Sequence, residues 1–249
     1  MYAICTLPLC PVRAEASDRA ELVDQLLFGD RFTVTDRHEK WSRIQCDDYD
    51  YTGWIDNKQY TPVDEQQYEA VGKWSCIATE PITSVTLGDD SLMVPMGSRL
   101  PADWSRRQTD VHPLPIDLAV KLLHSPYLWG GKSCMGIDCS GLTQVTFRAS
   151  GIKLPRDASQ QACCGIPVTS LDEALPNDLC FFTKLTDKTN ANISDSCDLP
   201  ITHVGIYMGQ HSIIHASGQV RIDRIDSQGI FNSGLGHYTH RLHSIRRMH

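Results

Sequence analysis

The chain has 249 residues, of which 41% are hydrophobic and 21% charged, and its formal net charge is −7. This composition is typical of a globular protein of one to two domains, with room for a small third, and it excludes a disordered chain, a collagen-like fibre and a coiled coil. No apolar run approaches the roughly 18 residues that a membrane span needs, and no basic stripe favours nucleic acid. We therefore expect neither a membrane nor a nucleic acid as partner.

Residues 1–60 contain short alternating segments, rich in aromatic and β-branched residues and separated by Gly and Asp turns. This pattern predicts a small β-barrel. A weaker series of the same kind predicts a second, degenerate barrel over residues 61–112. A third unit is predicted over residues 113–249.

Two segments of this third unit, 116–123 and 138–150, have helical spacing. Strand-like pieces follow at 178–182, 202–208, 212–216 and 220–222. This order predicts an α+β domain with an antiparallel sheet. The polar stretch 184–200 predicts a loop insertion that could shape a groove. The basic, histidine-containing segment 237–249 predicts a solvated tail.

The ten cysteines are spread along the chain without C-x-x-C pairs, which argues against a zinc site. The first residues lack the charged segment and apolar run of a signal peptide, which predicts a cytoplasmic protein. Most thiols should then be reduced, and one is a candidate nucleophile. We expect no metal and no other cofactor.

Cys139 is the candidate nucleophile. If Asp138 caps the predicted helix, Cys139 is its first residue, where unpaired N–H groups and the helix dipole favour a thiolate and lower the thiol pKa. A buried structural cysteine is the alternative interpretation. Ser140 and Gly141 weigh against it because they break the apolar pattern around Cys139.

Two histidines are candidates for the base and its orienting partner. The alternation of 202–208 places His203, Gly205 and Tyr207 on one face. A hairpin centred on Gly209 would place His203 directly opposite His215, whereas a slip of one residue would send them to opposite faces. With Cys139 they would form a nucleophile, a base and an orienting group.

Six motifs in this order resemble those of the NlpC family of papain-like cell-wall cysteine peptidases, over about residues 113–249. The motifs are Tyr127–Gly131, Asp138–Leu142, Leu154–Gln161, Asn177–Phe182, His203–Tyr207 and Ile214–Ala216. The resemblance implies a helix carrying Cys139 packed on an antiparallel sheet, with Cys139 as nucleophile, His203 as base and His215 as orienting residue. Asn177 stands where the family usually has Gly, and the 184–200 insertion is longer than usual.

Residues 1–60, and more weakly 61–112, resemble the bacterial SH3-like barrels fused to such domains. This arrangement is similar to the subgroup that hydrolyses γ-D-glutamyl-diamino-acid bonds in murein peptides with a free N-terminal L-alanine, in which the first barrel closes one end of the cleft. The substrate residues implied by the resemblance are Tyr51, Glu21 (with Glu15 as second choice), Tyr127, Asp138, Ser140 and Ser159. Lysine and diaminopimelate both remain open as the residue after D-glutamate.

Four functions compete at this point. The favoured one is a cytoplasmic peptidase that trims released murein peptides. An exported hydrolase of intact wall is disfavoured by the missing signal peptide and the many thiols. A non-catalytic binding protein is disfavoured by the complete Cys–His–His set. An acyltransferase with the same thiol chemistry stays open.

Overall fold

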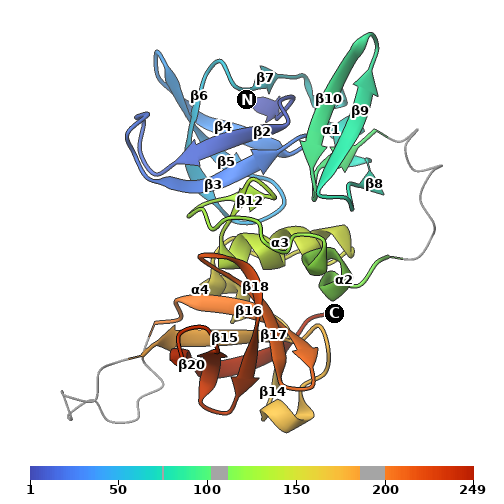
Figure 1. Ribbon diagram of the computed structural model, residues 1–249. Helices are drawn as coiled ribbons and strands as arrows, with labels where there is room; N and C mark the ends of the chain where they lie inside the picture. Colours follow the sequence, from blue (N-terminus) through green and yellow to red (C-terminus); the bar gives the residue numbers. More distant parts are fainter. Residues whose placement is uncertain (75, 102–111, 186–199) are drawn as a thin grey trace.

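The computed structural model describes residues 1–74, 76–101, 112–185 and 200–249 (Figure 1). An N-terminal sheet and a C-terminal sheet lie at opposite ends of the molecule, and helix α3 lies between them (Figure 1). Among the described residues, no helix has the length and apolar character that crossing a membrane requires.

Within the described residues, the N-terminal sheet has seven strands in the order β3-β2-β6-β5-β4-β1-β7. They are β1 (Tyr2–Ile4), β2 (Leu9–Arg13), β3 (Leu22–Leu27), β4 (Arg31–Arg37), β5 (Trp41–Cys46), β6 (Thr52–Asp56) and β7 (Thr61–Pro62). Alternating strand residues such as Val12, Phe32 and Ile44 point inward and form a separate apolar core. Because β7 pairs with β1, the sheet extends to Pro62, past the expected boundary at residue 60.

The next part begins with helix α1 (Glu65–Gly72), which is capped by reciprocal hydrogen bonds between Asp64 and Gln67. Strands β8 (Cys76–Ile77) and β11 (Arg99–Leu100) form one two-stranded sheet, and β9 (Ile82–Leu87) and β10 (Asp90–Pro95) form another. Residues 75 and 102–111 lie outside the described residues. The second barrel over 61–112 therefore stays a prediction.

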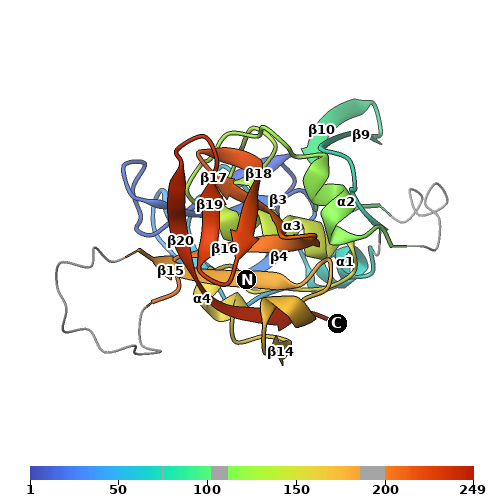
Figure 2. The ribbon, with the colours of Figure 1, turned by 60° about the horizontal axis from the view of Figure 1, so that its bottom comes forward.

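The C-terminal part contains helices α2 (Pro115–Val120), α3 (Cys139–Ala149) and α4 (Ala158–Gln161) and the short 3-10 helix η2 (Leu171–Glu173). Its strands are β12 (Lys132–Ser133), β13 (Gly136–Ile137), β14 (Ile166–Val168), β15 (Leu179–Lys184), β16 (His203–Gly209), β17 (Ser212–Ser217), β18 (Gln219–Asp226), β19 (Gly229–Asn232) and β20 (His237–Arg247). Strands β20-β15-β16-β17-β18-β19 follow one another, and β19 pairs again with β20. The expected antiparallel sheet is thus closed into a barrel (Figure 2).

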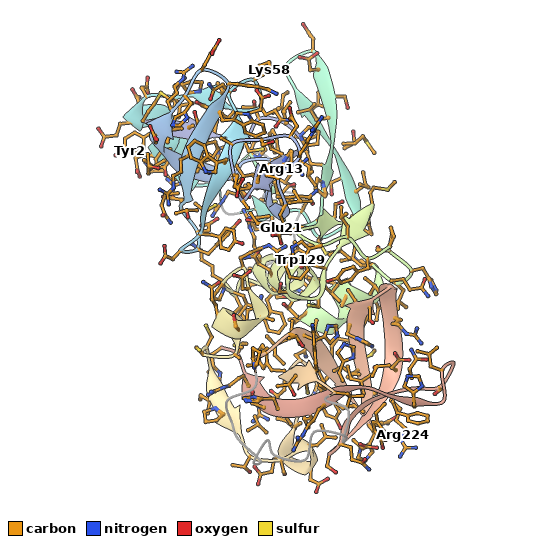
Figure 3. The ribbon with its side chains drawn as sticks, turned by 90° about the vertical axis from the view of Figure 1, so that its left-hand side faces the viewer. Tyr2, Arg13, Glu21, Lys58, Trp129 and Arg224 are labelled. Atoms are coloured by element: carbon orange, nitrogen blue, oxygen red, sulfur yellow. The ribbon has the colours of Figure 1, made fainter. Side chains whose placement is uncertain are left out.

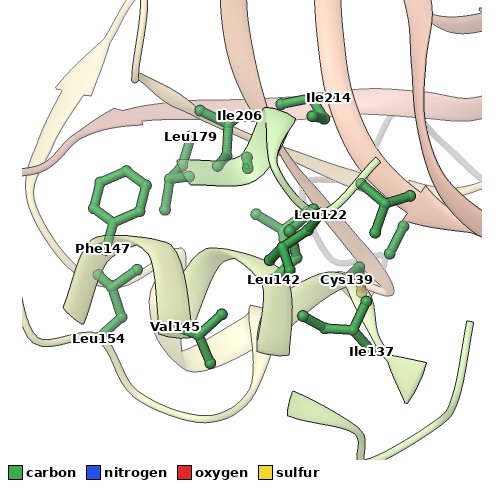
Figure 4. Close-up of a cluster of buried hydrophobic side chains, with 14 of the residues drawn as sticks. Leu122, Ile137, Cys139, Leu142, Val145, Phe147, Leu154, Leu179, Ile206 and Ile214 are labelled. Carbon is green, nitrogen blue, oxygen red and sulfur yellow. The ribbon is translucent and has the colours of Figure 1, made fainter. Parts of the chain in front are cut away.

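Helix α3 packs on this barrel through an apolar face. Leu142 and Val145 of α3 belong to the same buried cluster as Ile206 of β16 and Ile214 of β17 (Figure 4). The strands alternate, so that Tyr207 belongs to a different cluster from Ile206. The helix that begins at Cys139 is therefore fixed against the strands that carry the two histidines.

The expectation of a solvated tail at 237–249 is wrong. Residues His237–Arg247 form β20, which pairs with β14, β15 and β19. Of its side chains only that of Ile245 is fully buried, so the strand shows no apolar alternation even though its backbone is paired on both sides. Of the predicted 184–200 insertion, residues 186–199 lie outside the described residues, and Lys184 ends β15.

Candidate active site

Cys139 is the first residue of α3, as predicted, and Asp138 is the helix cap. The Asp138 carboxylate accepts hydrogen bonds from the backbone N–H of Gly141 at 2.6 Å and of Gly130 at 2.8 Å. These bonds fix the turn that presents Cys139 and satisfy one of the free N–H groups of the helix end.

The pKa of the Cys139 thiol is raised, not lowered as the helix position predicts. Burial raises it to about 12, and the charge of Asp138 adds to this. Hydrogen bonds from the backbone N–H groups of Val204 and Ser140 and the charge of Arg156 act in the opposite direction but are outweighed. A thiol with this pKa is protonated at neutral pH, so the sulfur could act as a nucleophile only after passing its proton to a base.

His203 and His215 share one face of the barrel wall, but they are not directly opposite as expected. His215 pairs with Gly205 and not with His203, so the register differs from the predicted one by two residues. The turn lies at Gln210 and His211 and not at Gly209, and a bulge lies between Tyr207 and Gly209. Because the side-chain period of a strand is two, a shift of two residues keeps both histidines on the same face. The hairpin turn itself consists of Gln210 and His211, both with positive φ, as in a type I′ turn.

Because Gly205 has no side chain, the imidazole rings of His203 and His215 can come into contact. A Cβ atom at this position would lie 2.9 Å from the Cβ of His215 and 2.8 Å from the Cδ1 of Ile213. Without it, His215 reaches diagonally to His203, and the His203 Nε2 and His215 Nδ1 atoms lie 2.8 Å apart. Both histidines are buried.

Asp223 and Arg221 extend the chain of contacts that begins with the predicted pair His203 and His215. The Nε2 atom of His215 lies 3.1 Å from Oδ2 of Asp223, and Arg221 forms an ion pair with the same carboxylate at 2.8 Å. Sequence reasoning missed both: the predicted strand ended at residue 222, before Asp223, and Arg221 within it was not connected to His215. The alternation continues to Asp226 in β18; Arg221 pairs with His215, and Asp223, two residues further along, lies on the same face opposite Ile213.

A third histidine, His240 of β20, stacks on His203. The ring centroids are 4.1 Å apart and the ring planes are inclined by 22°. Burial is the main cause that holds the pKa of His203 well below its usual value, and the neighbouring His215 and His240 lower this pKa further. Burial and His215 lower the pKa of His240 to about 4. Both rings are therefore neutral at pH 7, so His203 is free to accept a proton.

Cys139 lines a cavity of about 450 Å³, and residues of the N-terminal part, such as Val23 of β3, line it as well. Five of the six predicted substrate residues line this cavity: Glu21, Tyr51, Asp138, Ser140 and Ser159. The sixth, Tyr127, lines an adjoining hollow of about 460 Å³ with His203 and His240. The two hollows share Lys184 and Thr202, whereas Glu15 lines neither of them.

A buried ionic cluster joins the N-terminal sheet to the cap of α3. The Arg156 side chain is 2% exposed and contacts Asp24 through Nε at 2.7 Å and Asp138 through Nη2 at 2.6 Å. Lys132 contacts Asp24 at 3.1 Å. Burial alone would raise the pKa of Asp24, but Lys132 and Arg156 lower it below its usual value, so the carboxylate stays ionised.

The side chains at the rim of the cavity make fewer hydrogen bonds and ion pairs than those of the ionic cluster. Glu21 is exposed and accepts a hydrogen bond from the Trp129 indole at 2.6 Å (Figure 3). The Tyr51 hydroxyl lies 3.5 Å from the carbonyl oxygen of Val23. Asp157, which sequence reasoning did not single out, also lines the cavity, and burial raises its pKa.

The described residues contain no group of three or more His, Cys, Asp or Glu side chains arranged to hold a metal ion.

Comparison with known proteins adds two family matches. Residues 124–238 match the NlpC/P60 family, and residues 12–59 match the bacterial dipeptidyl-peptidase SH3 domain. The chain is 28% identical to the gamma-D-glutamyl-L-lysine dipeptidyl-peptidase of Bacillus subtilis over 226 residues, covering 77% of this chain and 71% of the relative. It is 24% identical to dipeptidyl-peptidase 6 of Lysinibacillus sphaericus over 271 residues, covering 92% and 93%.

Among solved structures, an NlpC/P60 family protein from Bacillus cereus is similar over 99% of both chains, with a TM-score of 0.73 and 19% sequence identity. At this identity the similarity is one of fold. It extends over the N-terminal sheet, the middle part and the barrel together, because nearly the whole of each chain is covered.

Proposed function

Because this chain carries an NlpC/P60 peptidase domain behind a bacterial dipeptidyl-peptidase SH3 domain, we propose that it hydrolyses the γ-D-glutamyl-diamino-acid bond of small murein peptides with a free N-terminal L-alanine. The observation that carries this proposal is the cavity in which Cys139 meets Glu21 and Tyr51 of the SH3 part. We further propose that the catalytic domain is papain-like, with the α3 helix presenting the nucleophile to the histidine-bearing strands.

The proposed chemistry starts from a neutral thiol and a neutral imidazole. His203 takes the thiol proton as the Cys139 sulfur attacks the γ-glutamyl carbonyl carbon, and the backbone N–H of Cys139 stabilises the resulting oxyanion. His203 then gives this proton to the leaving amine, and a thioester remains on Cys139. Water, deprotonated by His203, hydrolyses the thioester and restores the thiol. His215 orients His203 throughout.

We propose that carboxylates of the cavity select substrates that have a free N-terminal amine. Asp138 is fully engaged with Arg156 and the helix end. We therefore expect Asp157 and Glu21 to hold the ammonium group of the substrate, with Tyr51, Ser140 and Ser159 as neutral partners. A glycan-linked stem peptide has no free amine and would meet the SH3 part, so exclusion contributes to specificity.

The experiment is product analysis by mass spectrometry with L-Ala-γ-D-Glu-L-Lys, its diaminopimelate analogue and the N-acetylated form of each. The name of the Bacillus subtilis relative favours the lysine peptide. Losing one buried, charge-assisted hydrogen bond costs about 2–5 kcal/mol, so acetylation should lower kcat/KM by roughly 30-fold to several thousand-fold. Cys139→Ala, with an unchanged fold, should give no product.

Each alternative predicts a different outcome of this experiment. Equal cleavage of free and acetylated peptides would exclude the amine-recognition role of the SH3 part. Transfer of the dipeptide to an added amine would indicate an acyltransferase. Binding without turnover would indicate a binding protein, and release of fragments from intact peptidoglycan would indicate a wall hydrolase.

A further inference from the structure

We propose that Asp223, held by Arg221, is a positioning residue that fixes the tautomer of His215 and thereby makes Nδ1 of His203 the acceptor for the Cys139 proton. This inference deepens the proposed function and rests on it. It concerns the histidine relay, which we define as the contact chain His203, His215, Asp223 and Arg221.

The tautomer follows from the donor and acceptor rules along the relay. An ionised carboxylate only accepts, so the Nε2 atom of His215, 3.1 Å from Asp223, carries the proton. A His215 ring that carries this single proton has its lone pair at Nδ1. The His203 Nε2 atom, 2.8 Å away, must therefore donate to it. The lone pair of a neutral His203 ring is left at Nδ1, which is the atom free to act as a base.

The surroundings of Asp223 keep its carboxylate ionised. Burial alone would raise its pKa, but hydrogen bonds from His215 and Arg221 lower it below the usual value. The side chain of Asp223 is 4% exposed and that of His215 is 1% exposed, so water does not compete strongly for their contact. A buried ion pair with few competing partners holds its geometry.

The other ionisable groups around the relay come from three elements. His240 of β20 faces both histidine rings, with centroid distances of 4.1 Å to His203 and 6.1 Å to His215. Cys139 lies on α3, and Lys184 of β15 lies at the junction of the two hollows. The Nε2 atom of His215 is hydrogen-bonded to Asp223 of β18 and not to any of these three groups.

Asp223→Asn tests the proposal, because an amide can donate as well as accept and so no longer dictates the tautomer. Arg221→Gln is the second variant, since it leaves the Asp223 carboxylate without its cation. Arg224→Gln is the matched control: Arg224 lies on the same strand, has the same charge and is 66% exposed, with its ion pair to Asp226. Thermal midpoints of all three variants establish that the fold is retained.

The first readout is the ¹⁵N spectrum of the histidine rings, which reports directly which nitrogen of His203 and His215 carries the proton. The second is the rate at which iodoacetamide alkylates Cys139, followed by peptide mapping from pH 6 to pH 10. The third is kcat for the γ-D-glutamyl peptide. For histidines that ligate a metal, loss of the group that orients the ring typically costs about 10- to 100-fold in affinity or activity, and we expect a loss of the same order here.

We expect Asp223→Asn to redistribute the His215 tautomers, to slow Cys139 alkylation at pH 7 by about 10- to 100-fold, and to lower kcat by a similar factor. From pH 6 to pH 10 the alkylation rates of variant and wild type should stay apart, because the pKa of the Cys139 thiol is about 12 and its ionisation in this range depends on His203. Arg221→Gln should have a smaller effect in the same direction, and Arg224→Gln none.

Unchanged tautomers and alkylation profiles in Asp223→Asn would overturn the proposal, as would an equal effect of Arg224→Gln. The first two readouts use no substrate. If the wild type fails to cleave the murein peptide but the tautomers and the alkylation profile change as expected, the proposed function is wrong and the positioning role of Asp223 stands.

Discussion

Two buried polar networks meet beside Cys139, and they are built from different chemistry. On one side lies the histidine relay, in which imidazole rings contact one another and end on an ion pair. On the other side lies the ionic cluster of Asp24, Lys132, Arg156 and Asp138. The relay runs through imidazole rings, which can both donate and accept a hydrogen bond, whereas the ionic cluster consists of carboxylates and cations held in ion pairs.

This difference indicates a division of labour. The ionic cluster balances two carboxylates with two cations, so its members hold each other and the cap of α3 in one geometry. The relay keeps His203 neutral through burial, so that it can accept the thiol proton. We therefore expect damage to the relay to change the rate with little change in stability, and damage to the ionic cluster to change stability first.

The largest expected effect comes from breaking the relay at its reacting end. His203→Ala removes the proton carrier, and general acid–base catalysis typically contributes about 10²- to 10⁴-fold, so kcat should fall by this factor. The matched control is His243→Ala, because His243 lies on β20 and is exposed. If the variant kept more than a tenth of wild-type kcat, His203 would not be the base.

Breaking the ionic cluster should have the next largest effect, on stability. Arg156→Met leaves Asp24 and Asp138 buried without their shared cation, and removing one partner of a buried pair costs about 3–5 kcal/mol. For a chain of this size each kcal/mol corresponds to about 2–4 °C in Tm, which calorimetry can measure. Arg37→Met, at an exposed position, is the control. A Tm unchanged by Arg156→Met would contradict the structural role of the ionic cluster.

The pH dependence of stability sharpens the comparison further. The pKa of His240 is lowered to about 4 and that of His203 lies well below its usual value, so between pH 6.5 and about 4 the unfolded chain binds more protons than the folded one. The free energy of unfolding should therefore fall as the pH falls through this window. Urea titrations at several pH values measure this slope, and His240→Asn should flatten it. A slope unaffected by that substitution would assign the acid sensitivity to other groups.

The smallest effect is expected at the rim, which belongs to neither network. Trp129→Phe removes the hydrogen bond to Glu21, and because both residues are exposed the free energy of unfolding should change by less than about 0.5 kcal/mol. Steady-state kinetics should show a KM raised a few-fold with kcat kept, since Glu21 loses its position at the cavity. A fall in kcat as large as that of His203→Ala would place the rim in the reacting centre.

Local signals in the sequence were sufficient to place Cys139 at the start of its helix. The cap at Asp138 and the helix that follows Cys139 are set by neighbouring residues, so they could be predicted. The shared face of His203 and His215 could also be predicted, because it depends only on strand period. The register could not, because it depends on the position of the turn, which lies at Gln210 and His211 and not at Gly209, and on the bulge between Tyr207 and Gly209.

The contacts that the sequence did not reveal join residues far apart in the chain or lie on strands without apolar alternation. Arg156 and Asp24 are 132 positions apart, and no local pattern connects them. His240 belongs to a strand whose polar side chains resemble a solvated segment, although its backbone completes the barrel. Cooperation between such residues becomes visible only when the packed arrangement is known.

The closing position of β20 also has a consequence for the order in which activity arises during synthesis. Translation releases the chain from its N-terminus, so α3 with Cys139 and the hairpin with His203 and His215 emerge well before His237–Arg247. Until that strand pairs with β15 and β19, His203 lacks its stacking partner and the barrel is open beside it. A nascent chain, or one clipped before β20, would thus carry Cys139, His203 and His215 without the strand that encloses His203 on this side.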